Sequence, residues 1–299
     1  MKPLIILGPT AVGKSSLAIE LAKKFSGEII SADSMQVYRG MDIGTAKPTP
    51  EERQKIPHHL IDVRNPDAEW SVSDFIRETE SLNSALKSKG KRTIIVGGTG
   101  LYLWSLLEGF AFPITPADPS LRVKLAKEDP VALYARLLSL DQAAAAKIHP
   151  HDKKRTIRAL EVVETTGQPI SLLQKNRQPL LDHEYLLIGL NLPRPELYLR
   201  INERVDAMIA KGLINEVESL LAKGFSKKLP SFQALGYKEV SEYLDGQWTK
   251  DQMIEELKKR TRNFARRQMT WFRRFKDVKW FDQVDNDLII EYILSNDQD

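Results

Sequence analysis

The sequence predicts an α/β fold, in which a parallel sheet is flanked by helices and an all-helical domain is inserted between the strands. Three observations predict it. Short apolar runs alternate with segments of helical periodicity up to about residue 112, and residues 121–182 show helical patterns but no convincing strand. Residues 185–192 then return to the character of a buried strand. We therefore predict a core of residues 1–114 and 183–299, with residues 115–182 as the insertion.

The first part of the chain alternates strand and helix. Strands are predicted over residues 3–7, 28–32 and 93–96, where the chain is short of charge and rich in β-branched residues. Apolar spacing predicts a helix over residues 15–25. Another is predicted over residues 71–89, because Ser71 and Asp74 match a capping box and Gly90 follows the last turn.

The later elements are mostly helical. Pro113, Pro116 and Pro119 interrupt the alternating pattern before the insertion. Apolar periodicity and end signals predict the remaining elements. Helices are predicted over residues 129–140, 142–148, 152–166, 197–210, 213–222 and 251–275, and a last strand over residues 278–281.

Composition excludes several classes of protein. The 299 residues are 42% hydrophobic and 28% charged, which suffices for a large core in one or two domains. There is no cysteine, so disulfides, thiolate zinc sites and cysteine nucleophiles are excluded, and the five histidines lack a metal-site spacing. No apolar run is long enough for a signal peptide or a membrane span. We expect a cytoplasmic monomer that does not bind membranes.

Residues 8–15 read GPTAVGKS and fit the phosphate-loop pattern G-x-x-x-x-G-K-S. The pattern directly follows a predicted strand and opens a predicted helix, which is the context it requires. Glycine lets the backbone wrap tightly, so that the loop amides and the helix N-terminus face a phosphate. The alternative is a glycine-rich turn with an incidental lysine. The core is thus of the P-loop type, and its predicted phosphate-binding residues are Gly8, Thr10, Ala11, Val12, Gly13, Lys14 and Ser15, with the Ser15 hydroxyl as a Mg²⁺ ligand.

Two other strand ends carry polar residues, and ligands bind beyond the carboxyl ends of the strands in open parallel sheets. Asp33 follows the second strand and could act as general base, Mg²⁺ ligand or substrate anchor, or merely cap the next turn. Thr99 lies in the GGTG turn after the third strand and offers a hydroxyl to a phosphate or substrate, unless the turn is a plain one. No acidic pair ends this strand, which argues against an ATPase motor. Small kinases and transferases remain as the possible classes of enzyme.

Residues 258–276 hold nine Lys or Arg and no Asp or Glu. Helical projection groups Lys259, Arg262, Arg266 and Arg273 on one side, with Leu257, Phe264, Trp271 and Phe275 roughly opposite. We expect the apolar stripe to face the core and the cationic ridge to contact nucleic acid or pyrophosphate, since arginine is favoured for phosphate recognition. The alternative is a solvated face. A second basic cluster, residues 153–158, and Arg122 have the same two interpretations, contact with nucleic acid or exposure to solvent.

The ordered motifs GPTAVGKS, ISADSMQVYRGMDIGTAKP, PHHLID, VGGTGLY, FQALGY and RRQMTWFRR closely resemble those of the bacterial tRNA dimethylallyltransferases, over essentially the whole chain. The resemblance implies transfer of the dimethylallyl group from dimethylallyl diphosphate to N6 of adenosine 37, next to the tRNA anticodon, with release of pyrophosphate. It implies Mg²⁺ as cofactor and the anticodon stem-loop of tRNA as partner. Asp33 and Thr99 would be catalytic, and the helical insertion would grip the tRNA. The implied tRNA-binding residues are Asp33, Ser34, Met35, Gln36, Thr99, Arg122, Lys154, Arg155 and Arg158.

Two other functions share parts of this pattern. An ATP-dependent small-molecule kinase would use the same loop and an acid after the second strand, but the arginine-rich last helix and the basic insertion speak against it. A non-catalytic RNA-binding protein could use a nucleotide as a switch. Asp33 and Thr99, placed opposite the loop, favour chemistry instead.

Overall fold

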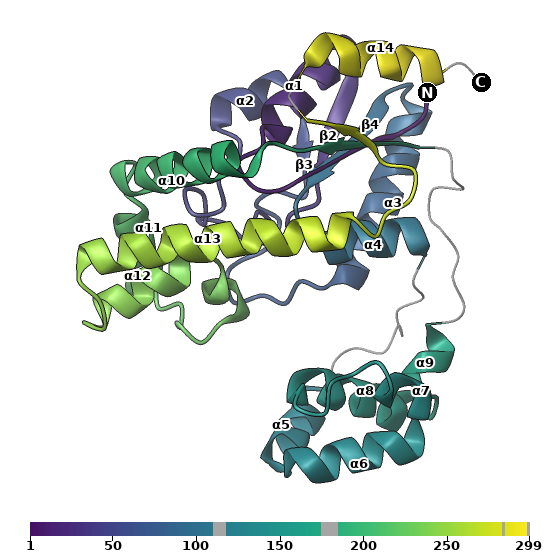
Figure 1. Ribbon diagram of the computed structural model, residues 1–299, viewed down its shortest axis with the longest axis vertical. Coiled ribbons are helices and arrows are strands. Elements are labelled where there is room, and N and C mark those ends of the chain that lie inside the picture. The colour runs from purple at the N-terminus through teal and green to yellow at the C-terminus, as the bar shows by residue number, and fades with distance from the viewer. Residues whose placement is uncertain (110–117, 175–184, 283–284, 298–299) are drawn as a thin grey trace. The chain divides into compact units, whose positions relative to one another are not determined.

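The computed structural model describes residues 1–109, 118–174, 185–282 and 285–297, and these form the predicted α/β fold (Figure 1). Pro113, Pro116 and both predicted domain boundaries lie outside the described residues. Within them, six strands form one sheet in the order β3-β2-β4-β1-β5-β6, and every pairing is parallel. The strands are β1 (Leu4–Leu7), β2 (Gly27–Ser31), β3 (His58–His59), β4 (Arg92–Gly97), β5 (Leu186–Leu190) and β6 (Lys279–Phe281).

Both faces of the sheet are covered, as the unbroken apolar character of β1 requires. All four residues of β1 are fully buried. Leu4 and Ile6 pack in one cluster with Leu17 of α1 (Lys14–Lys24) and with Ile289 of α14 (Asn286–Asn296). The last of these contacts was not predicted, because α14 follows the last motif and shows little amphipathic contrast.

The helices of the core follow the predicted pattern, with small differences at their ends. The capping box of Ser71 and Asp74 is present at the start of α3 (Val72–Ser88), and Gly90, which follows this helix, has a positive φ that ends the helix. Helices α2, α4, α12 and α14 and the short 3-10 helix η1 were not predicted. The core helices are α1 (Lys14–Lys24), α2 (Pro50–Lys55), α3 (Val72–Ser88), α4 (Gly100–Glu108), α10 (Arg194–Ala210), α11 (Leu213–Ala222), η1 (Pro230–Gln233), α12 (Tyr237–Leu244), α13 (Lys250–Phe272) and α14 (Asn286–Asn296).

The described part of the insertion, residues 118–174, is helical throughout its regular structure, as predicted. The helices α5 to α8 each begin at an aspartate whose carboxylate accepts amide hydrogen bonds of the first turn. Their core is apolar and small, and contains Leu133, Leu137 and Leu160. The helices are α5 (Pro119–Lys127), α6 (Pro130–Leu140), α7 (Gln142–Ala145), α8 (Lys153–Thr166) and α9 (Ile170–Leu173).

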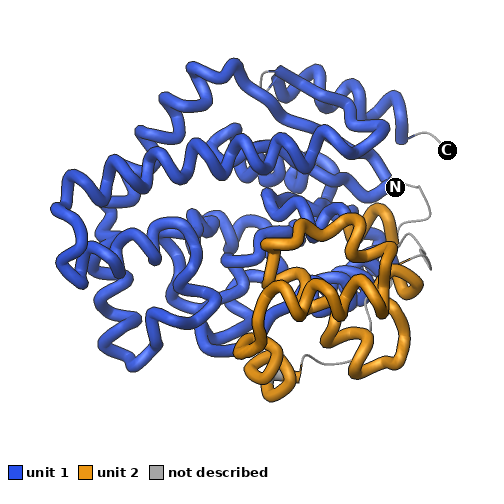
Figure 2. The backbone as a smooth tube through the Cα atoms, turned by 60° about the horizontal axis from the view of Figure 1, so that its bottom comes forward, with its two compact units in different colours: residues 1–104, 183–299 blue, residues 105–182 orange. Residues whose placement is uncertain are grey.

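The chain divides into two compact units, residues 1–104 with 183–299, and residues 105–182 (Figure 2). The first boundary lies within α4, nearer the N-terminus than the predicted residue 114. Among the described residues, no helix combines the length and the apolar character needed to cross a membrane.

Candidate active site

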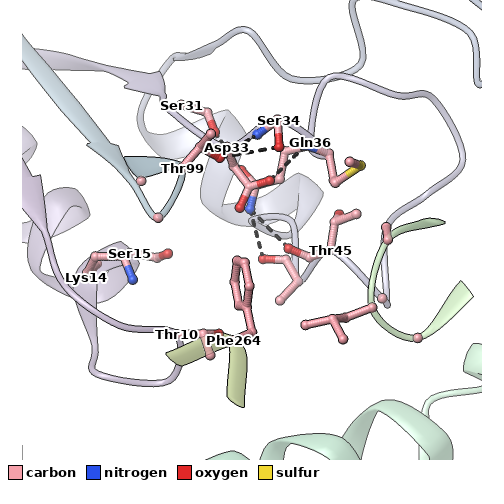
Figure 3. A pocket seen from close by; sticks show the side chains of 18 of the residues that line it. Thr10, Lys14, Ser15, Ser31, Asp33, Ser34, Gln36, Thr45, Thr99 and Phe264 are labelled. Carbon is pink, nitrogen blue, oxygen red and sulfur yellow. Dashed lines mark hydrogen bonds between the residues drawn. The ribbon is translucent and has the colours of Figure 1, made fainter. Parts of the chain in front are cut away.

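Three neighbouring strands end at the same pocket. The order β2-β4-β1 places the carboxyl ends of these strands side by side, so that Asp33, the Gly97–Thr99 turn and the phosphate loop meet although they are far apart in sequence. The pocket has a volume of about 380 Å³. Figure 3 shows Lys14 and Ser15 on one side, Asp33 and Gln36 on another, and Phe264 on a third side, next to Thr10. Of the predicted site residues, Thr10, Lys14, Ser15, Asp33, Ser34, Met35, Gln36 and Thr99 line the pocket.

The other predicted loop residues shape the loop rather than line the pocket. Gly8 has a φ of 151°, and a Cβ atom there would come within 2.5 Å of the Leu190 carbonyl oxygen, so only glycine fits. Gly13 and Ala11 also have positive φ, which turns the chain tightly before α1. Val12 is fully buried in the core, so its side chain anchors the loop.

Lys14 reaches into the pocket from the first turn of α1. Its Nζ donates a 2.7 Å hydrogen bond to the Pro9 carbonyl oxygen. Burial and the nearby positive charge of Arg204 lower the pKa of Lys14 to about 7, and the negative charge of Asp33 only partly opposes this. The lysine is therefore poised to gain a proton when an anionic ligand enters.

Asp33 is held by the chain that follows β2. Its Oδ1 accepts a 2.8 Å hydrogen bond from the Met35 amide, so the aspartate does cap the next turn while its carboxylate also lines the pocket. Burial raises the pKa of Asp33, although amide hydrogen bonds and the positive charges of Lys14 and Arg204 oppose it. A raised pKa makes this carboxylate a stronger base than an exposed aspartate.

Thr99 ties the β4 end to the β2 end. Its Oγ1 accepts a 3.0 Å hydrogen bond from the Ser34 amide and lies 3.4 Å from the Ser34 Oγ. The Gln36 side chain likewise joins two segments, the end of β2 and the loop that contains Thr45 and Ala46. It accepts a 2.8 Å hydrogen bond from the Ser31 hydroxyl and donates to the carbonyl oxygens of Thr45 and Ala46. These polar side chains are thus held by neighbouring backbone and by one another.

Several pocket residues were not predicted, because they lie on helices and belong to no phosphate-binding pattern. Arg204 comes from α10, and Phe264, Arg267 and Gln268 come from α13. The sequence shows that α13 carries a basic run, but periodicity alone does not show which of its residues face the strand ends.

The predicted orientation of α13 was partly wrong. Phe264, Trp271 and Phe275 are only half-buried. The buried residues of α13 lie on a different side of the helix, because the helix packs against α10 and α12 while it also faces the pocket. Residues of the buried stripe are Met253, Leu257, Thr261, Ala265, Gln268 and Phe272. As predicted, Lys259, Arg266 and Arg273 are exposed, but Arg262 is half-buried and donates to Asn202.

The basic run is also less cationic than its composition suggests. Lys258 pairs with Asp206 and Glu255, and Lys259 pairs with Glu256. Arg260 pairs with Glu256 and with two glutamates of α12, Glu239 and Glu242. The exposed cationic surface of α13 therefore begins at Arg266 rather than at Lys258.

In the insertion, two of the predicted tRNA-binding arginines hold a buried carboxylate. Glu161 is fully buried and forms ion pairs of 2.9 Å with Arg122 and 2.8 Å with Arg158. Burial alone would raise the pKa of Glu161, but the hydrogen bonds from these arginines outweigh it and lower the pKa. Arg122 and Arg158 thus stabilise the insertion. Lys154 and Arg155 are exposed on α8.

Residues 36–275 match the IPP transferase family, which is most of the chain. The chain belongs to the IPP transferase family. Among curated IPP transferase relatives, the tRNA dimethylallyltransferase of Carboxydothermus hydrogenoformans is 52% identical over 286 residues, covering 94% of this chain and 92% of that protein. The tRNA dimethylallyltransferase of Geobacillus kaustophilus is 48% identical over 288 residues, covering 95% and 91%.

Solved structures of tRNA-modifying prenyltransferases share the fold of this chain. The tRNA isopentenylpyrophosphate transferase of Bacillus halodurans is 41% identical, with a TM-score of 0.73 over 99% of this chain and 96% of that one. A eukaryotic dimethylallyltransferase acting on tRNA is 31% identical, with a TM-score of 0.85 over 99% of this chain and 79% of that one. These IPP transferase relatives support a prenyltransferase enzyme over the kinase alternative.

Proposed function

We propose that this chain transfers the dimethylallyl group of dimethylallyl diphosphate to N6 of adenosine 37, next to the tRNA anticodon, and releases pyrophosphate. The observation that carries the proposal is the meeting of a phosphate loop with the Asp33 carboxylate in one pocket. Membership of the family and the names of its tRNA-modifying relatives support the choice of substrates.

The pocket offers a place for each part of the donor. Thr10, Lys14 and Ser15 would hold the diphosphate, where Lys14 gains its full charge. The dimethylallyl group would lie against the apolar part of the lining. That part includes Ala18, Ile29, Ile61, Val96, Met208, Leu257 and Phe264.

The reaction forms one bond and breaks another. The adenine N6 nitrogen attacks C1 of the dimethylallyl group, and the bond between C1 and the diphosphate oxygen breaks. The leaving pyrophosphate takes the electron pair and is stabilised by Lys14 and the loop amides. The Asp33 carboxylate accepts the proton lost from N6, for which its raised pKa suits it. Arg204 adds positive charge beside these groups.

Mg²⁺ fits this pocket as a partner of the diphosphate. Among the described residues, no three His, Cys, Asp or Glu side chains gather where they could hold a metal ion. Mg²⁺ usually keeps several waters and binds through substrate phosphates and few protein oxygens. The Ser15 hydroxyl, in the first turn of α1, would supply such an oxygen. Bound Mg²⁺ would neutralise charge on the diphosphate.

The acceptor base must leave its stack to enter a pocket of this kind. We expect residues 33–36 and Thr99 to contact the flipped adenine, and the insertion to grip the anticodon stem-loop through exposed cations such as Lys154 and Arg155. We further propose that the protein acts as a cytoplasmic monomer.

The test is mass spectrometry of unmodified tRNA after incubation with protein, Mg²⁺ and dimethylallyl diphosphate. We expect a mass gain of one dimethylallyl group on the nucleotide at position 37. Asp33→Ala should slow the single-turnover rate by about 10²–10⁴-fold, whereas Asp67→Ala, which removes an exposed carboxylate outside the pocket, should not. Transfer of label from γ-labelled ATP to a small acceptor, with no change in tRNA mass, would reject the proposal in favour of a kinase.

A further inference from the structure

Gln268 uses both ends of its side-chain amide to join two loops. It lies on α13 and is only 4% exposed. Its Oε1 accepts a 2.8 Å hydrogen bond from the Thr10 amide of the phosphate loop. Its Nε2 donates a 2.9 Å hydrogen bond to the Gly98 carbonyl oxygen, in the turn after β4. The oxygen and the nitrogen of the amide each make one hydrogen bond to a backbone group of the opposite kind, so the buried amide has one well-defined orientation.

The fit around this bridge is tight. A Cβ atom on Gly98 would lie 2.2 Å from the Gln268 Nε2, closer than any such contact allows. The turn therefore accommodates the glutamine because residue 98 has no side chain. This close approach explains why position 98 of the GGTG turn is a glycine, which phosphate binding alone does not require.

The bridge continues from the phosphate loop toward Asp33. Gly98 is followed by Thr99, whose Oγ1 accepts the hydrogen bond from the Ser34 amide, and Ser34 is next to Asp33. Thr10, Gln268, Gly98, Thr99 and Ser34 thus form one connected path. One end of this path holds the phosphate loop, and the other holds the carboxylate.

We propose that Gln268 is a positioning residue that sets the separation between the phosphate loop and Asp33, so that C1 of the prenyl donor and the attacking nitrogen lie in line. The proposal rests on the proposed function. Gln268 acts through backbone atoms and not on the reacting atoms. A displacement of about 1 Å at a reacting centre can cost about 10²-fold in rate, so a loose bridge should lower the rate more than the affinity.

Gln268→Met tests the proposal, because methionine has a similar length but lacks the amide. We expect the single-turnover rate at saturating donor and tRNA to fall by about 10–10²-fold, while the dissociation constant of pyrophosphate changes by less than about threefold, roughly 0.7 kcal/mol. Exchange of the backbone amide hydrogens of residues 10–13 and 97–99 should become faster. Gln252→Met is the matched control, since Gln252 caps the start of the same helix, away from the pocket.

Gln268→Glu adds a second variant. Glutamate keeps the acceptor for Thr10 but cannot donate to Gly98, and it brings negative charge to the phosphate loop. We expect a lower rate and, in contrast to methionine, weaker pyrophosphate binding. A folded Gln268→Met protein with the wild-type rate would overturn the proposal. Unchanged amide exchange in Gln268→Met would overturn the bridge itself, and this result does not depend on prenyl transfer. A wild-type protein that does not modify tRNA would instead reject the proposed function.

Discussion

The Tyr237 hydroxyl donates a 2.6 Å hydrogen bond to the Glu216 carboxylate, which also accepts hydrogen bonds from three consecutive backbone amides, those of residues 42–44. Tyr237 is fully buried, and its ring leaves no room for a Cβ atom on Gly44. The loop held in this way continues to Thr45 and Ala46, whose carbonyl oxygens bind Gln36. One glutamate of α11 thus supports a wall of the pocket.

Glu216→Gln should lower the free energy of unfolding by about 1–3 kcal/mol, because the new amide group would present donors to backbone donors. Chemical denaturation measures the change. Glu218→Gln is the control, since Glu218 is exposed on the same helix. An equal stability of both variants would show that the three amides do not need a carboxylate.

The rate of prenyl transfer should fall at low pH as Asp33 becomes protonated. Burial raises its pKa above the ordinary value of 3.8, so the acid limb of the single-turnover rate should lie above that pH. The sign follows from the role of a base, which must be deprotonated before it can accept a proton. A pH profile of wild type and Asp33→Ala measures this, and a limb that survives in the variant would assign it to another group.

Binding of pyrophosphate should take up a proton at pH 8. Lys14 has a pKa of about 7 in the free protein, so it is largely neutral at pH 8 and becomes charged beside the ligand. Its contribution to affinity should therefore be greatest below pH 7 and should weaken as the pH rises. Calorimetry in buffers of different ionisation enthalpy measures the uptake. Lys14→Arg, which stays charged, should lose it and controls for ionisation of pyrophosphate.

Neutralising Lys154 and Arg155 together should weaken tRNA binding and flatten its salt dependence. We expect the log–log slope to change by nearly one unit for each RNA phosphate that the variant no longer neutralises. The rate at saturating tRNA should stay the same, because this pair acts on the backbone of the RNA. Binding measured at several salt concentrations tests it. Weaker binding with an unchanged slope would mean that these residues bind no phosphate.

Arg158→Gln should behave differently, although Arg158 lies one turn away on the same helix. It removes one of two cations from the buried Glu161, so it should cost about 1–3 kcal/mol of stability. Thermal unfolding measures this, with Arg155→Gln as the control. If both variants unfold alike, the ion pair of Glu161 contributes nothing to the insertion.

Local features were predictable because neighbouring residues encode them. The phosphate loop is eight consecutive residues between a strand and a helix, and Gly8, Gly13 and Lys14 have their roles within it. The strand ends were predictable for a similar reason, since parallel strands present their carboxyl ends at one edge. The position of Asp33 opposite the loop followed from that rule.

The sequence by itself determined the α/β class, the helical insertion, the phosphate loop and the strand-end residues Asp33 and Thr99. Only the tertiary structure decided which helix faces complete the pocket, and it brought Arg204 and Gln268 there from α10 and α13. It also decided which charges are neutralised: Arg158 lies within reach of Glu161 on α8 itself, but Arg122 meets this glutamate only once α5 and α8 pack together. Periodicity shows that a helix has a buried side, but the partner that covers each side is set by packing between segments distant in sequence.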